Sequence, residues 1–455
     1  MQVATHGAGS NVRSMKIGVI GAGIVGVAAA LALQARGHSV TILERDAVAA
    51  GASRGNAGAL AFADVIPLAT PGVMRQAPRW LLDPNGPLSI PPAYALRIAP
   101  WLMAFWRASW PDRYRAAVRA QGALMALSSA ALERLVARHG LESLLRREGQ
   151  LQLYDTAAQF RASLPGWAER QAAGVRFELL ESAGGIAEIQ PGIAPRFAHA
   201  GYTPDWVNVA DPELWTQRLA ADFVGAGGAI ERAEICKLMP SEGWVRVVGY
   251  PGEWRFDRVV VAAGAFSGRL LARLGLRLPL ETERGYNTTL PAGAFDLRTH
   301  VTFSGHGFVV SRIGEAIRVG GGVELGGLDL PPRMARAAAL LRKAAMFLPG
   351  LDTRGGAPWM GFRPSMPDSL PVIDAAPHPA VVLAFGHGHL GLTQAAGTAE
   401  LVADIVDGRP PAIDIAPYRA SRFSAGPKWA AGYAGASAGG VAAFRSEFSA
   451  AKAPP

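Results

Sequence analysis

Residues 16–44 read KIGVIGAGIVGVAAALALQARGHSVTILE, and this stretch sets the architecture of the first domain. The apolar run Lys16–Ile20 is typical of a strand that is buried in a parallel sheet. The Ala- and Leu-rich residues 27–36 have the composition of a helix. A second apolar run at residues 39–43 ends at Glu44. The order strand, glycine-rich turn, helix, strand predicts a βαβ unit.

The turn between the first strand and the helix carries the spacing G-x-G-x-x-G. Gly21 permits the tight turn, Gly23 lets the backbone approach a pyrophosphate, and Gly26 lets the helix pack close to the sheet. The helix N-terminus offers N–H groups and the positive end of a dipole to phosphates. Glu44 can accept hydrogen bonds from adenosine ribose hydroxyls and would repel the 2′-phosphate of NADP. The stretch therefore predicts an adenine dinucleotide site, without separating FAD from NAD.

The overall composition limits the classes of function. The chain has 455 residues, half of them hydrophobic, which is enough for two or three domains with cores of their own. The formal net charge of +9 is compatible with an anionic membrane surface or an anionic substrate. We do not expect nucleic-acid binding, because no run of five or six like charges and no nucleic-acid-binding motif is visible. The single cysteine, Cys236, fits a reducing compartment, so we expect a cytoplasmic protein.

Nucleotide-binding sequence recurs in separated blocks of the chain. We expect an α/β fold with a discontinuous Rossmann-type domain on a parallel sheet, formed by residues 15–75, 205–275 and 355–425. We expect residues 76–204 and 276–354 to form a second, α+β substrate domain on a mixed or antiparallel sheet. This dispersal favours FAD, because NAD dehydrogenases usually keep their dinucleotide fold in one continuous unit.

Three further segments carry expectations of their own. Residues 1–14 lack the apolar core of a signal peptide, and residues 426–455 are rich in Ala, Gly and Ser, so we expect both to be disordered. Residues 62–125 are rich in Pro and Trp. Their aromatic side chains are either buried core or part of an amphipathic helix in peripheral contact with the inner face of the cytoplasmic membrane.

Beyond these features, the sequence resembles the FAD-dependent D-amino acid oxidase superfamily from about residue 15 to residue 423. It is most similar to the D-amino acid dehydrogenase branch, and glycine oxidase and sarcosine oxidase are more distant relatives. The resemblance rests on residues 17–46, GASRGNAG at 51–58, VVVAAGAFS at 259–267, RGY at 284–286, GFRPSMPDSLP at 361–371 and GHGHLGLT at 386–393.

The resemblance implies FAD as the cofactor and a set of residues that contact it. That set is Gly21, Gly23, Ile24, Val25, Gly26, Glu44, Arg45, Ser53, Asn56, Ala57, Gly58, Ile235, Ala263, Gly264, Gly361, Gly388, His389, Leu390, Gly391, Leu392 and Thr393. Some relatives attach FAD covalently through Cys or His. We expect non-covalent FAD here, because no His closely follows residues 51–58 and Cys236 falls in a middle strand. The sequence offers no set of metal ligands, so we expect no metal site.

The resemblance also implies a substrate site. In relatives, the arginine that corresponds to Arg363 binds the substrate carboxylate, and a guanidinium can contact both carboxylate oxygens at once. The alternative for Arg363 is an ion pair with Asp368. Tyr286 either adds a hydroxyl to the same carboxylate or simply packs, and Phe308 stands where glycine oxidase relatives have a substrate-binding Tyr. His387 is expected to contact the substrate, and both His387 and His389 are expected to line the loop or pocket rather than to act as bases.

The sequence therefore predicts oxidation of a D-amino acid, or of a cyclic imino acid such as D-proline or hydroxyproline. Hydride would pass to flavin N5 and electrons onward to a quinone or another acceptor. Three alternatives remain open. They are an oxygen-using oxidase of glycine or N-methyl amino acids, a flavin-binding subunit of a multi-chain dehydrogenase, and an NAD-dependent dehydrogenase.

Overall fold

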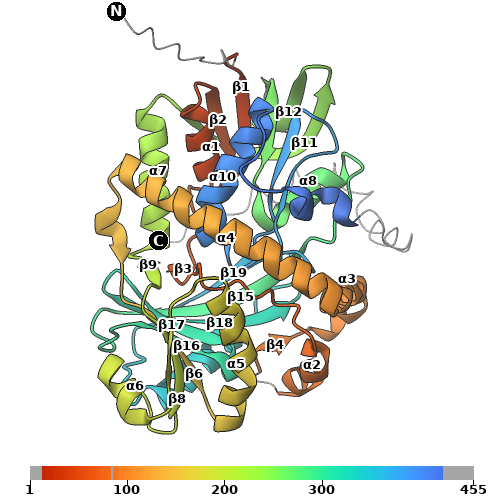
Figure 1. Ribbon diagram of the computed structural model, residues 1–455. Coiled ribbons are helices and arrows are strands. Elements are labelled where there is room, and N and C mark those ends of the chain that lie inside the picture. Colours follow the sequence, from red (N-terminus) through yellow and green to blue (C-terminus); the bar gives the residue numbers. More distant parts are fainter. Residues whose placement is uncertain (1–12, 84–85, 424–455) are drawn as a thin grey trace, which may run out of the picture.

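A computed structural model describes residues 13–83 and 86–423 of the chain (Figure 1). The predictions for residues 1–14 and 426–455 fall almost entirely outside this described part. Two large sheets organise the molecule, and the long helix α4 (Pro111–His139) crosses in front of the region between them. In Figure 1, the strands β1 and β2 lie in the upper half and the strands β15–β18 in the lower half.

The upper sheet has six strands in the order β10-β2-β1-β14-β21-β20. The neighbours of β1 are all parallel, and only β20 runs antiparallel, against β21. The bounds are β1 Lys16–Ile20, β2 Ser39–Glu44, β10 Ala229–Arg232, β14 Arg258–Val261, β20 Val372–Ala375 and β21 Val381–Phe385. The predicted strands at residues 16–20 and 39–43 are confirmed, and three separated segments of the chain supply this one sheet.

The helices α1 (Ile24–Gln34) and α10 (Gly391–Asp407) pack against each other and against this sheet in one hydrophobic core. A third helix, α7 (Pro212–Gly225), packs on α1. Asp211 is the N-cap of α7: its carboxylate accepts hydrogen bonds from the N–H groups of Glu213 and Leu214 at 2.8 and 3.1 Å.

The lower sheet is mixed and has nine strands, in the order β19-β15-β18-β17-β16-β6-β8-β7 with β4 paired to β18. Its bounds are β4 Leu88–Ser89, β6 Gln150–Tyr154, β7 Glu178–Leu180, β8 His199–Thr203, β15 Glu281–Leu290, β16 His300–Phe303, β17 Phe308–Ile313, β18 Ala316–Leu325 and β19 Ala357–Ser365. The helix α9 (Ala335–Phe347) covers one face of this sheet through a separate hydrophobic core. A Rossmann-type parallel sheet and a second, mixed sheet were both predicted, and both are confirmed. The exact domain boundaries remain predictions.

Residues 229–237 do not form a single strand. The strand β10 ends at Arg232, and the N–H of Ala233 donates to Glu44 O at 2.7 Å. The following residues, Glu234–Ser241 (β11), pair instead with β12 (Trp244–Tyr250) in a three-stranded sheet that β13 (Glu253–Phe256) completes.

The remaining elements are short or peripheral. They are β3 Ala59–Leu60, β5 Leu145–Arg146, β9 Val207–Val209, α2 Val73–Leu82, α3 Ala95–Ala108, α5 Ala157–Ala172, α6 Ala183–Ile189 and α8 Ser267–Ala272. The strands β3, β9 and β5 form a small sheet of their own.

Candidate active site

A cavity of about 830 Å³ lies between the two large sheets, and residues of both line it. The upper sheet contributes the ends of β1, β2, β14 and β21 with the loops that follow them. The lower sheet contributes residues of β15, β18 and β19, among them Glu283, Asn287, Arg318 and Arg363. This volume is within the range of small-molecule and cofactor sites.

The turn after β1 is held by contacts that only glycine permits. Gly21 has φ +108°, and a Cβ on Gly26 would lie 2.0 Å from Gly21 O. The Glu44 carboxylate supports the turn, since its two oxygens accept from Ala22 N–H at 2.6 Å and Asp46 N–H at 2.9 Å. A carboxylate has about four acceptor positions, so Glu44 can also accept ribose hydroxyls. The backbone cradle therefore fits an adenine dinucleotide.

The loop at residues 51–58 closes over this cradle. Ser53 Oγ accepts from Ile24 N–H at 3.0 Å, and Asn56 Oδ1 accepts from Gly58 N–H at 2.8 Å. The lower sheet also holds the loop, because Arg318 donates to Asn56 O at 2.6 Å and Asn287 donates to Gly55 O at 3.0 Å. Sequence reasoning missed both of these contacts, which join strands far from the loop in the sequence.

The helix α10 points its N-terminus at the cavity, where its first residues Gly391 and Leu392 line the wall. The first N–H groups of a helix have no acceptor within the helix, and the dipole makes that end positive. A flavin gains negative charge at its N1–C2=O edge on reduction, so this end of α10 fits that edge.

Almost all of the residues predicted to contact FAD line the cavity; Gly26, Gly58 and Thr393 do not. Gly26 instead brings α1 close to the turn, and a Cβ on Gly58 would lie 2.9 Å from Val209 O. The Thr393 hydroxyl accepts from Ala61 N–H at 3.0 Å and donates to Ala59 O at 3.3 Å, so it links α10 to β3. These three residues shape the wall from behind it.

Arg363 is half-buried on β19 and lines the cavity. Its Nη1 donates to Gly322 O at 3.0 Å, and its guanidinium lies over Gly285, where a Cβ would meet Nη2 at 2.3 Å. The glycine of the RGY motif thus makes room for the arginine of the GFRP motif. The alternative ion pair with Asp368 is wrong, because Asp368 pairs with Arg422 at 2.8 Å. Burial lowers the pKa of Arg363, and the neighbouring Glu283 carboxylate opposes that change.

Tyr286 and Phe308 line the cavity, and neighbours in the core hold both side chains. The Tyr286 hydroxyl donates to Glu324 Oε1 at 3.0 Å and accepts from Arg333 N–H at 3.0 Å, and burial raises its pKa. Phe308 stacks on Phe303 with ring centroids 4.6 Å apart. Both side chains belong to the hydrophobic core under α9, and both residues also line the cavity, so their contact with the substrate stays a prediction.

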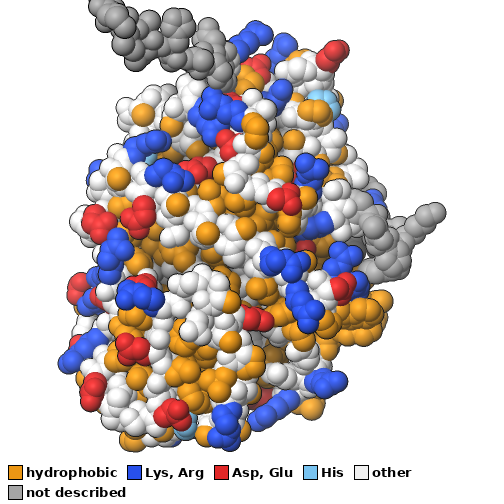
Figure 2. Space-filling view, viewed as in Figure 1, with side chains coloured by type: hydrophobic (Ala, Val, Ile, Leu, Met, Phe, Trp, Pro, Cys, Tyr) orange, Lys and Arg blue, Asp and Glu red, His pale blue; other side chains and the backbone are white. Residues whose placement is uncertain are grey.

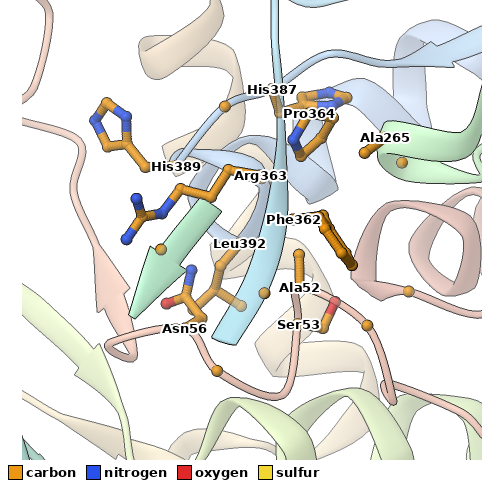
Figure 3. A pocket seen from close by; sticks show the side chains of 18 of the residues that line it. Ala52, Ser53, Asn56, Ala265, Phe362, Arg363, Pro364, His387, His389 and Leu392 are labelled. Carbon is orange, nitrogen blue, oxygen red and sulfur yellow. The ribbon is translucent and has the colours of Figure 1, made fainter. Parts of the chain in front are cut away.

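The two histidines differ in their surroundings. His387 is 3% exposed, its Nε2 lies 3.0 Å from Thr398 Oγ1 of α10, and burial lowers its pKa to about 3. Its imidazole is therefore neutral and lies against α10, and because His387 also lines the cavity, its contact with the substrate stays a prediction. His389 lines the cavity beside Arg363, and burial lowers its pKa. Figure 3 shows Arg363 and His389 on one side of the β19 ribbon and Phe362 on the other.

Two further residues of the wall carried no signal in a motif. Glu283 is 5% exposed and stands directly opposite Arg363 in the β15–β19 register. The Trp359 ring occupies the space beside Gly55 and Gly361, where a Cβ would lie 1.8 and 1.9 Å from ring atoms. Gly361 therefore makes room for this indole within the wall. Within the described residues, no group of three or more His, Cys, Asp or Glu could hold a metal ion.

An apolar surface lies away from the cavity, on α2 and α3. We define it by its exposed large side chains, which are Leu81, Leu82, Leu96, Met103, Trp106 and Trp110. Figure 2 shows hydrophobic side chains gathered over α3. The expectation of buried aromatics holds for Trp101 but is wrong for Trp106 and Trp110. None of the helices in the described part of the chain is long and apolar enough to span a membrane.

Comparisons with known proteins agree with this geometry. The model of the family described as "DAO: FAD dependent oxidoreductase" matches residues 16–405. A D-amino-acid oxidase of Bradyrhizobium diazoefficiens is 34% identical over 90% of this chain and 98% of its own length. A D-amino acid dehydrogenase of Chromohalobacter salexigens is 33% identical over 90% of this chain and all of its own length.

Solved structures show the same fold. Glycine oxidase from Geobacillus kaustophilus superposes with a TM-score of 0.70 at 24% identity, covering 90% of this chain and 99% of its own. An L-proline dehydrogenase from P. horikoshii gives a TM-score of 0.69 at 20% identity, covering 90% of this chain and 98% of its own.

Proposed function

The chain belongs to the family of FAD-dependent oxidoreductases, and on this premise we propose that it oxidises a D-amino acid or a cyclic D-imino acid such as D-proline or hydroxyproline. The observation that carries the proposal is Arg363, a half-buried side chain on the cavity wall. Its guanidinium lies over Gly285, where the absence of a side chain leaves room for it. A guanidinium in this setting binds a carboxylate through two parallel hydrogen bonds, which fix both its position and its orientation.

The roles of the chain in this reaction are binding and orientation. Bound FAD supplies the capacity to accept the hydride that the substrate loses from Cα. The glycine turn, Glu44 and the N-terminus of α10 hold the cofactor, and Arg363 anchors the substrate carboxylate. Holding two reactants in a fixed geometry supplies much of the rate enhancement of such reactions. The product imine hydrolyses to a 2-oxo acid or, from a ring substrate, remains cyclic.

The test is a panel of amino acids in both enantiomers, assayed with an artificial dye as the electron acceptor. We expect turnover with D-amino acids or cyclic D-imino acids and anaerobic bleaching of the flavin by the same compounds. Bleaching of the purified single chain would exclude a flavin-binding subunit that depends on partner chains for catalysis. A protein that binds FAD and is bleached by no amino acid would refute the proposal.

We propose further that FAD is bound without a covalent link. The only cysteine, Cys236, is exposed on β11 and is not part of the cavity wall. Acid precipitation should release all of the yellow colour into the supernatant. Flavin that stays with the precipitated chain would contradict this part of the proposal.

For the electron acceptor we propose a quinone at the inner face of the cytoplasmic membrane. The support is the apolar surface of α2 and α3, where exposed Arg75, Arg79 and Arg97 accompany the apolar side chains. Basic and apolar side chains together favour an anionic lipid surface. Co-sedimentation with anionic vesicles should fall when Leu96 and Trp106 are both changed to Ser. Rapid reoxidation of the reduced flavin by oxygen would favour the oxidase alternative instead.

A further inference from the structure

A carboxylate stands beside Arg363 in the cavity wall. Glu283 of β15 is the direct cross-strand partner of Arg363 in β19, so both side chains leave the same face of the sheet. Both residues line the cavity, and Glu283 is only 5% exposed. A buried carboxylate is costly unless it has a partner.

Despite this proximity, the two charges do not pair with each other. Within the described residues, the Glu283 carboxylate takes part in no hydrogen bond or ion pair within 4.0 Å. The guanidinium of Arg363 turns instead toward Gly285 and Gly322 O. Gly285 is two residues from Glu283, which amounts to about 7 Å along a strand. The wall thus holds an unpaired anion and a largely unpaired cation a short distance apart.

The other face of the same strand shows what a closed pair looks like. Arg284, next to Glu283, forms an ion pair with Glu324 at 3.3 Å with both side chains fully buried. Arg284 also donates to the carbonyl oxygens of Gly327 at 2.7 Å and Leu330 at 2.6 Å. On the face of β15 toward α9, the buried charge of Arg284 is paired with Glu324. On the face toward the cavity, Glu283 and Arg363 form no ion pair with each other.

We propose that Glu283 and Arg363 together form a receptor for a zwitterion, in which Glu283 binds the substrate's ammonium group. This inference rests on the proposed function and extends it with a second recognition residue. An α-amino acid carries its ammonium and carboxylate on one carbon, so a neighbouring anion and cation of one wall can each form a charge-assisted hydrogen bond of about 2.8 Å with it. The negative charge of Glu283 then gives specificity for zwitterions, because Glu283 repels a carboxylate ligand that has no ammonium group.

The test compares matched ligands on the FAD-loaded enzyme and its Glu283→Gln variant. D-proline carries the ammonium, and tetrahydrofuran-2-carboxylate has a ring oxygen in its place. Binding is measured as KM for D-proline and as the inhibition constant for the analogue. We expect Glu283→Gln to raise the KM for D-proline about 10- to 100-fold and to lower the inhibition constant of the analogue severalfold. Glu283→Asp, which keeps the charge, should retain the preference for the zwitterion.

The opposite signs separate this role from a merely structural one. If Glu283 only positions Arg363, the Gln variant should weaken both ligands alike, and that result would overturn the inference while leaving the proposed function intact. Equal affinities in variant and wild type would overturn it as well. If the wild-type enzyme binds no amino acid at all, the inference and the proposed function fail together. Exposed Glu315→Gln serves as the control for the charge change, and the FAD content of each variant reports on folding.

Discussion

The two walls of the cavity are built in different ways. The wall from the upper sheet presents much backbone: the turn at Gly21 and Gly23, behind which Gly26 packs, and the first residues of α10. The wall from the lower sheet presents side chains of antiparallel strands, among them the cross-strand neighbours Arg363 and Glu283. A backbone cradle needs a local run of particular residues, whereas a side-chain wall draws single residues from distant strands. Substitutions in the upper wall should therefore reduce flavin binding, whereas substitutions in the lower wall should reduce activity on the substrate.

The largest effect is expected from Gly26→Ala. The new Cβ would lie 2.0 Å from Gly21 O, and a backbone atom on the turn cannot move aside. We expect the variant to lose its FAD and with it all activity, as seen in the flavin absorbance of the purified protein. Gly225→Ala is the matched control, because a Cβ there meets nothing within 4 Å. Full flavin content in Gly26→Ala would mean that the cradle is not the cofactor site.

Arg363→Ala should leave the flavin bound and strongly weaken binding of the substrate carboxylate. Truncating one partner of a buried charge pair costs about 3–5 kcal/mol, so kcat/KM should fall on the order of 10³-fold. Arg363→Lys keeps the charge but not the two-pronged geometry and should recover only part of the loss. Arg354→Ala is the control, because the Arg354 side chain is 90% exposed, and it should keep the kcat/KM of wild type. Near-normal activity on amino acids would contradict the role of Arg363.

Gly285→Ala tests whether the side-chain wall also depends on a glycine. The added Cβ would meet the Arg363 guanidinium at 2.3 Å, and this flexible group would shift rather than unfold the sheet. Because small displacements of a positioning group reduce catalysis strongly, we expect kcat/KM to fall about 10- to 100-fold at unchanged flavin content. Gly252→Ala, with open space around its Cβ, should behave like wild type. A loss of flavin in Gly285→Ala would show that the two walls are not separable.

The smallest expected effect concerns His387. Burial lowers its pKa from 6.5 to about 3, so the folded state favours the neutral imidazole. Its contribution to stability is fully present above pH 6.5 and is lost as the pH falls toward 3, by about 2 kcal/mol at pH 5. His387→Gln should therefore lose about that much less stability between pH 7 and pH 5 in denaturant titrations. Identical slopes for wild type and His387→Gln would contradict the assignment.

The contrast between the walls also explains what could be predicted from the sequence. The βαβ unit, Glu44, the Asp211 cap and most residues of the cofactor wall follow from local patterns. Arg363 was identified through a motif. The roles of Tyr286 and Phe308 stay predictions, because alternation along a strand decides the face of each side chain and the sequence does not reveal which face meets the cavity. Glu283 was missed because its importance comes from a neighbour 80 positions away on another strand.

The order of the upper sheet has a consequence for biosynthesis. The strand β1 lies between β2 and β14, and β14 in turn pairs with β21, which ends at Phe385. The helix α10, whose end faces the cavity, begins only after that point. During synthesis the glycine turn therefore lacks β21 and α10 until these later segments have been made. Completion of the flavin site must wait for them.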